Sequence, residues 1–342
     1  LTMNKLTKIG ASALCGSLAV VSAANAGELS VAGGATMTYV SNEGTVTGNP
    51  LGMSTGMTFT GSGELDGGTT FALTMTQTDK TAWSGGSLVM TTPNMGTINF
   101  NHGAAGIGVD RYDDAMPTAW EETTGTGLGT GLDYVSGVTG SNAIEWTLPS
   151  SFVPEGMSAH LTYNPRANGG LASDKASGGT ASEGVGAGMG LTVSHTGLMD
   201  GLTAFAGVAE IEQETNGGMT GDKTEMVLGA TYAVGGVTVG YQVSNENFNR
   251  SAGTQYYDNA AYGVSFAVND DLSISYGEHK SERGGGTANV APIEAKAKSA
   301  QIAYSMGGAS IKVAQTSIVN QNYTSGSGAD RDGTTVALSL AF

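Results

Sequence analysis

The chain has 342 residues, of which 30 are acidic and 14 basic, giving a formal net charge of −16 at pH 7. So acidic a chain cannot neutralise a phosphate backbone, which excludes nucleic-acid binding. Apolar residues are plentiful and periodic and only 13% of residues are charged, which excludes a disordered chain.

The first 26 residues have the features of a secretory signal peptide. Lys5 and Lys8 precede an apolar stretch at 9–23, and Ala24-Asn25-Ala26 supplies the small residues of a cleavage site. We therefore expect residues 1–26 to be removed and residues 27–342 to form one domain. The single cysteine, Cys15, lies in the part to be removed, so the remaining chain has no disulfide to form.

After this segment no apolar run approaches the ~20 residues that a membrane helix needs. From Glu28 onward, apolar residues instead recur at every second position, the period of a strand with one face in lipid and the other in water. The expected outward-facing stretches are, in chain order, Leu29 to Tyr39, Met57 and Phe59, Phe71 to Met75, Leu88 and Met90, Ile98 and Phe100, Ile144 to Leu148, Ala159 to Tyr163, Met189 to Val193, Phe205 to Ile211, Met226 to Val234, Val237 to Val243, Tyr262 to Val268, Leu272 to Tyr276, Ile302 to Met306, Ile311 and Val313, and Thr334 to Phe342.

Short turns alternate with long polar loops along these stretches. Gly235-Gly236 and Gly307-Gly308 are two-residue hairpin signals, whereas the loops between hairpins reach nearly forty residues. This asymmetry is typical of a membrane barrel with one end in the periplasm and the other outside. A soluble β-solenoid would need a repeat of fixed period, and the sequence has none. We therefore predict an all-β fold, a 16-stranded antiparallel transmembrane β-barrel.

One segment, residues 103–140, lacks the strand pattern and holds the densest group of carboxylates in the chain. A connection this long is uncommon in a compact domain and is usually functional or disordered. We predict that it is a long third loop that folds into the barrel and narrows it. The residues expected at this constriction are Asp110, Arg111, Tyr112, Asp113, Asp114, Trp120, Glu121 and Glu122.

The stretch from Asp110 to Glu122, the strand alternation and the terminal Phe342 resemble the Gram-negative general porins, in particular the alphaproteobacterial type. The resemblance implies a homotrimer in the outer membrane, in contact with its lipid and lipopolysaccharide, through which small hydrophilic solutes diffuse passively. It also implies that Phe342 is a signal for the barrel-assembly machinery. In that family a basic wall faces the third loop, but here Lys80 is the only base in the first four strands.

Strand parity predicts which charges line the lumen. Glu145, Glu210, Glu212 and Glu225 are expected to face inward, with Lys312 as the only strand-borne base that clearly does so. Together with the loop carboxylates, they predict a pore that concentrates cations.

Three alternatives remain open at this stage. Asp110, Asp113 and Asp114 could hold Ca²⁺, which prefers oxygen ligands in flexible loops, and no other cofactor is expected. The barrel could be a substrate-specific channel or an adhesin-like surface barrel. Catalysis is not expected, since the four histidines, at 102, 160, 195 and 279, form no motif with a serine and an orienting group.

Overall fold

The computed structural model describes residues 27–43, 49–65, 67–79, 84–103, 106–138, 142–167, 185–214, 218–285 and 291–342. The predicted signal segment lies outside these ranges, as does Lys80. No helix within them is long and apolar enough to cross a membrane.

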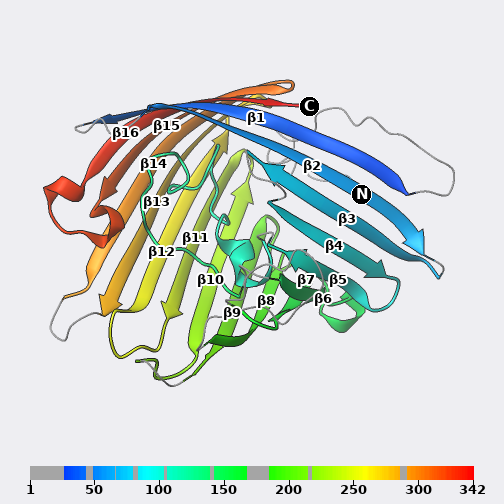
Figure 1. Ribbon diagram of the computed structural model, residues 1–342. Coiled ribbons are helices and arrows are strands. Elements are labelled where there is room, and N and C mark those ends of the chain that lie inside the picture. The colour runs from blue at the N-terminus through cyan, green and yellow to red at the C-terminus, as the bar shows by residue number, and fades with distance from the viewer. Residues whose placement is uncertain are drawn as a thin grey trace.

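Sixteen strands form one closed antiparallel barrel, in which each strand pairs with its sequence neighbours and β1 also pairs with β16 (Figure 1). The predicted fold class is therefore confirmed. The strands are β1 (Glu28–Glu43), β2 (Leu51–Leu65), β3 (Thr69–Thr78), β4 (Gly85–Thr92), β5 (Gly96–His102), β6 (Asn142–Thr147), β7 (Met157–Asn164), β8 (Val185–His195), β9 (Leu202–Gln213), β10 (Lys223–Val234), β11 (Val237–Asn247), β12 (Thr254–Ala267), β13 (Leu272–Gly285), β14 (Ile293–Met306), β15 (Ala309–Val319) and β16 (Arg331–Ala341).

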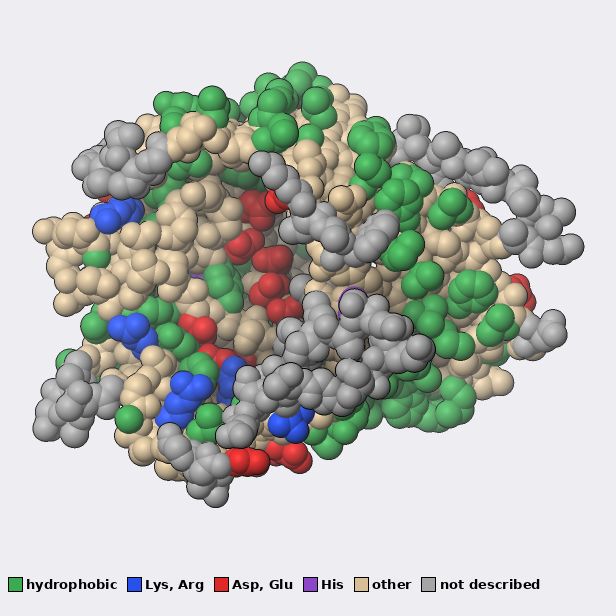
Figure 2. Space-filling view, in the orientation of Figure 1, with side chains coloured by type: hydrophobic (Ala, Val, Ile, Leu, Met, Phe, Trp, Pro, Cys, Tyr) green, Lys and Arg blue, Asp and Glu red, His purple; other side chains and the backbone are tan. Residues whose placement is uncertain are grey.

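The two faces of the wall differ in chemistry, as strand alternation requires. One face, here called the apolar face, carries exposed large side chains such as Met53, Leu73, Tyr241 and Ile302. The other, the polar face, carries Thr, Ser, Gln and Glu between them. Hydrophobic side chains cover much of the outside in Figure 2, whereas acidic side chains gather in a central hollow.

The tight turns lie at one end of the barrel and the long connections at the other. In the two-residue turns, Gly235 and Gly307 adopt φ values of +59° and +63°, where a side chain would be strained. The seam between the first and last strands closes at the tight-turn end. There Gly33 and Phe342 exchange two backbone hydrogen bonds, of 3.1 and 2.9 Å.

Strand β9 contradicts the predicted facing. Phe205 and Ala209 are buried on the polar face, whereas Val208 is 48% exposed on the apolar face. Glu210 and Glu212 share the parity of Val208 and are exposed there, so the prediction that they line the lumen is wrong. Sequence periodicity failed on this strand because both of its faces are apolar.

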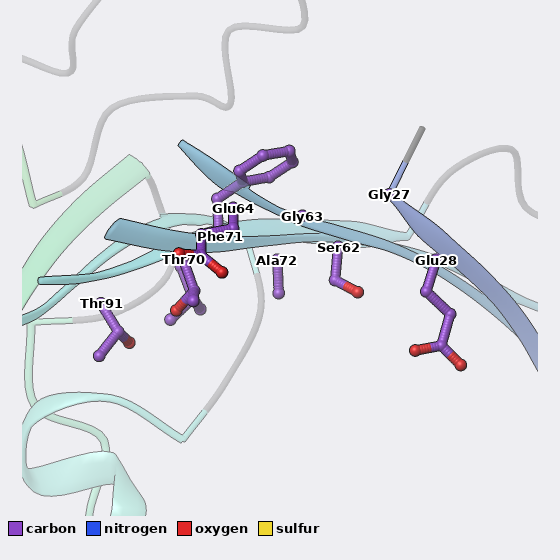
Figure 3. Close-up of a pocket in the computed structure, with 10 residues that line it drawn as sticks. Gly27, Glu28, Ser62, Gly63, Glu64, Thr70, Phe71, Ala72 and Thr91 are labelled. Carbon is purple, nitrogen blue, oxygen red and sulfur yellow. The ribbon is translucent and has the colours of Figure 1, made fainter. Parts of the chain in front are cut away.

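The polar face of β1 to β4 is open near the tight turns. A cleft of about 480 Å³ lies here, lined by residues that include Glu28, Ser62 and Thr70. In Figure 3, Glu28, Ser62 and Ala72 point to one side of the sheet and Phe71 to the other. This part of the wall therefore shows the strand alternation plainly.

Candidate functional site

The long segment at 106–138 contains a single 3₁₀ turn, η3 (Gly108–Tyr112), and no strand. Its residues contact polar-face side chains on strands from β6 round to β16. These contacts fall into a first anchor, a crossing and a second anchor.

The first anchor is Glu145, on the polar face of β6. Its carboxylate accepts a hydrogen bond from the backbone N–H of Gly108 at 2.7 Å and from the Thr162 hydroxyl at 3.1 Å. The Arg111 guanidinium forms an ion pair with the other oxygen at 2.5 Å. Three donors thus hold one buried carboxylate, and the start of the segment is attached to β6 and β7.

Apolar packing strengthens this attachment. Val109 is fully buried against the polar-face side chains of β9 and β10, in a cluster that includes Phe205 and Val227. The Tyr112 ring stacks on Phe205 with centroids 4.4 Å apart, and its hydroxyl donates to the Val193 carbonyl at 3.0 Å. Strand β9 carries hydrophobic side chains on the polar face because the segment covers them there.

The crossing runs from β11 to β14. A Cβ at Gly240 would lie 2.6 Å from Pro117, and one at Gly263 would meet the Pro117 carbonyl oxygen at the same distance. Glycine is required at both positions because the segment lies directly on the wall. Farther on, the backbone N–H groups of Trp120 and Glu121 both donate to Gln301 Oε1 at 3.1 Å.

The second anchor is Glu225, on the polar face of β10. Its two oxygens accept hydrogen bonds from the backbone N–H groups of Ser136 at 2.7 Å and Gly137 at 2.5 Å. Between the crossing and this anchor, the Asp133 N–H donates to the Tyr323 hydroxyl at 2.6 Å. The Thr126 hydroxyl also meets that of Thr316 on β15 at 2.6 Å.

The carboxylates of the segment lie close enough to raise one another's pKa. Burial raises the pKa of Asp113 to about 6, and repulsion from Asp114 and Asp110 adds to this. Burial also raises the pKa of Glu122 to about 8, followed by its hydrogen bond with Asp114. The pKa of Glu121 is raised mainly by burial, while the ammonium of Lys312 lowers it. We call Asp113, Asp114, Glu121 and Glu122 the acidic cluster.

Asp110 differs from the acidic cluster because its carboxylate accepts a hydrogen bond from the Gly106 N–H at 2.6 Å. Its pKa is still raised, with burial as the largest cause. Among the described residues, no group of three or more His, Cys, Asp or Glu side chains is placed to hold a metal ion. The Ca²⁺ site considered at Asp110, Asp113 and Asp114 stays an untested prediction.

The polar face holds more bases than parity predicted. Lys312 lies there as expected, with its ammonium 5.9 Å from the Trp120 ring centroid and 3.1 Å from Ser339 Oγ. Lys223 on β10 is a second one and forms an ion pair with the buried Glu246. Arg283 on β13 is a third, 4.9 Å from the Tyr323 ring centroid. The prediction that Lys312 is the only clearly inward base is therefore wrong.

The predicted residues Glu145, Glu225 and Lys312 lie on the polar face beside the segment, which carries the eight residues predicted at the constriction, whereas Glu210 and Glu212 lie on the apolar face. Sequence reasoning missed three residues beside the segment: Lys223, Glu246 and His279, whose ring packs edge-on against Tyr134 with centroids 4.5 Å apart. Alternation along β10, β11 and β13 was the signal that could have placed them.

A family model described as Gram-negative porin matches residues 10–309. The chain belongs to this family. No curated protein matches the sequence. Membership of this family and the closed 16-stranded barrel together place the chain in the outer membrane as a multi-pass β-barrel channel.

Three solved structures show the same fold at low identity. Salmonella typhi OmpF in complex with daunomycin has 14% identity and a TM-score of 0.69, covering 93% of this chain and 98% of its own. An anion-selective porin from Comamonas acidovorans has 13% identity and a TM-score of 0.63, with 92% and 99% covered. Vibrio cholerae OmpT in a trimer form has 11% identity and a TM-score of 0.63, with 93% and 100% covered.

Proposed function

We propose that this porin is a general diffusion channel for small hydrophilic solutes and ions, narrowed by residues 106–138. The observation that carries the proposal is the path of the segment. It is anchored on β6 and β10 and crosses to Gln301 on β14 and Thr316 on β15, always on the polar face. A barrel of ~16 strands leaves an aqueous channel unless something folds into it, so a segment on this path sets the width.

We further propose that the pore prefers cations. The wall glutamates are largely paired, since Glu145 pairs with Arg111 and Glu246 with Lys223. The acidic cluster has four carboxyl groups and one nearby base, Lys312, whose charge acts on Glu121. Net negative charge at a narrow aqueous passage concentrates cations and excludes anions.

The fold alone does not determine this preference, because one structural neighbour is described as anion-selective. The sign must come from the side chains at the narrowest part. For that reason the proposal rests on the acidic cluster and not on the likeness to other porins.

The remaining parts of the proposal concern assembly. The trimer form of a structural neighbour supports a homotrimer. Residues 1–26 would direct export, and Phe342, on the seam with Gly33, would be read by the barrel-assembly machinery. The mature barrel would contact outer-membrane lipid and lipopolysaccharide. No catalytic role is proposed.

Reconstitution into a planar bilayer tests this proposal. We expect stepwise conductance and, in a salt gradient, a zero-current potential with the sign of cation preference. The preference should fade as salt rises, since the Debye length falls from about 10 Å at 0.1 M to about 3 Å at 1 M. Absence of channels would contradict the proposed pore, and preference for chloride would contradict its selectivity.

A further inference from the structure

Three lysines converge on one carboxylate on the apolar face of β13 and β14. The ammonium nitrogens of Lys296, Lys280 and Lys298 lie 2.9, 3.6 and 3.8 Å from the carboxylate oxygens of Glu278. We call these four residues the lysine cluster. Glu278 also accepts a hydrogen bond from the Tyr262 hydroxyl at 3.0 Å.

The lysine cluster points away from the lumen. Glu278 has the parity of Tyr276 and Lys298 that of Ile302, and both of these reference side chains are exposed on the apolar face. Residues of the opposite parity, such as Ser299 and Gln301, are buried beneath the segment. The lysines therefore have no part in the passage proposed above.

The height of the lysine cluster on the wall is also defined. On β13 the apolar-face residues run from Leu272 through Ile274 and Tyr276 to Glu278 and Lys280, away from the tight turns. Lysine on a lipid-facing strand is strongly unfavourable at mid-membrane and is tolerated near the interface. Directly above an apolar and tyrosine belt, the lysines lie where lipid headgroups begin.

One carboxylate does not satisfy three ammonium groups. Glu278 has two oxygens and its side chain is only 6% exposed, whereas the side chains of Lys280 and Lys298 are 43% and 44% exposed. Each ammonium has three donors, so several remain available to a partner. The next row of charges toward the long loops is acidic, with Asp258, Glu282 and Glu294 on the same face.

Two of these acids are partly engaged. Asp258 accepts a hydrogen bond from the Asn245 amide at 2.6 Å, and Glu282 accepts one from the Tyr256 hydroxyl at 3.1 Å. The excess positive charge is thus confined to a narrow level between apolar side chains and carboxylates. A monoanionic or dianionic group seated at that level complements it, and a polyanion spread along the wall does not.

We propose that the lysine cluster binds a phosphate group of a lipid in the outer leaflet, with the acyl chains on the apolar face below it. This inference rests on the proposed function as an outer-membrane channel, in which the short turns face the periplasm and the long connections face outside. A phosphate there would accept hydrogen bonds from Lys280 and Lys298 while Glu278 keeps the three side chains together.

The test uses the full-length protein in detergent, incubated with lipid A or with lipid A stripped of its phosphates, and read by native mass spectrometry. We expect the phosphorylated lipid to be retained at least about tenfold better, since its phosphates can pair with the exposed lysines. The triple variant Lys280→Gln, Lys296→Gln and Lys298→Gln should lose this preference. The paired variant Glu210→Gln and Glu212→Gln, on the apolar face of β9, should keep it.

Inorganic phosphate serves as a second probe. Competition by phosphate alone, with no dependence on acyl chains, would replace the lipid by a free anion and overturn the proposal. Equal retention of both lipids by the wild type would overturn it too. So would a triple variant that loses its oligomer but still prefers the phosphorylated lipid. If the triple variant does not fold, Lys298→Gln alone should weaken the preference, and its conductance shows separately whether the pore is intact.

Discussion

The wall and the segment use carboxylates in opposite ways. On the wall, Glu145 and Glu225 are surrounded by donors from the segment. On the segment, burial raises the pKa of Asp113 and of Glu122, and the nearby Asp114 carboxylate adds to both shifts. Wall carboxylates thus accept hydrogen bonds from the segment, whereas we propose that the segment carboxylates supply the charge that a passing ion meets. Changes at the two sets should therefore have separable effects.

The largest effect should come from a change that tests the assignment of faces. Leu73→Arg places a charge on the apolar face of β3, whereas Thr74→Arg places it on the polar face, where the Thr74 hydroxyl lies 3.4 Å from that of Thr60. The first change should cost about 2 to 4 kcal/mol and block assembly, because arginine would lie in lipid. Heat-resistant oligomer on gels measures the outcome, and equal yields from both variants would mean that the faces are misassigned.

A wall anchor should give the next largest effect. Glu225→Gln weakens two charge-assisted hydrogen bonds to Ser136 and Gly137, and bonds of this type contribute about 1.5 to 3 kcal/mol each. We expect the segment to loosen, with noisier currents and faster proteolysis between residues 106 and 138. Glu210→Gln, the same change on the outer face, is the control. A quiet pore with wild-type selectivity in Glu225→Gln would show that Glu225 is not an anchor.

Sequence reasoning recovered the wall better than the segment for a physical reason. Lipid imposes one apolar face on every strand, so alternation reveals strand number, turns and the inward positions of Glu145, Glu225 and Lys312. It failed at β9, where Phe205 and Ala209 pack against Val109 and make the inner face apolar as well. The partners of the segment depend on contacts such as Glu121 with Gln301, 180 residues apart, which no local pattern encodes.

The pH dependence of selectivity should give a smaller effect and sharpen the comparison. The pKa of Asp113 is raised to about 6 and that of Glu122 to about 8, so both lose protons as pH rises through this range. The acidic cluster then becomes more negative, and cation preference should increase between about pH 5 and about pH 9. A carboxyl with a raised pKa binds its proton more tightly in the folded protein than in the unfolded chain. The packing of the segment is therefore most stable at low pH, and this stability is lost as pH rises through about 8.

Zero-current potentials across that range provide the measurement. In the variant Asp113→Asn and Glu122→Gln, the potential should change much less with pH than in the wild type. A wild-type potential that stays constant, or moves toward chloride preference as pH rises, would show that these two carboxyls do not face the ion path.

The central claim is that the acidic cluster sets the sign of selectivity. The expected effect is small in energy, because a permeability ratio of a few fold corresponds to less than about 1.4 kcal/mol. The most direct measurement is the zero-current potential, in a low-salt gradient, of the wild type and of the variant Asp113→Asn, Asp114→Asn, Glu121→Gln and Glu122→Gln. Asp110→Asn is the matched control, because Asp110 is bonded to Gly106. We predict cation preference in the wild type and the control, and a potential near zero in the fourfold variant with oligomers intact. Chloride preference in the wild type, or undiminished cation preference in the fourfold variant, would contradict the account.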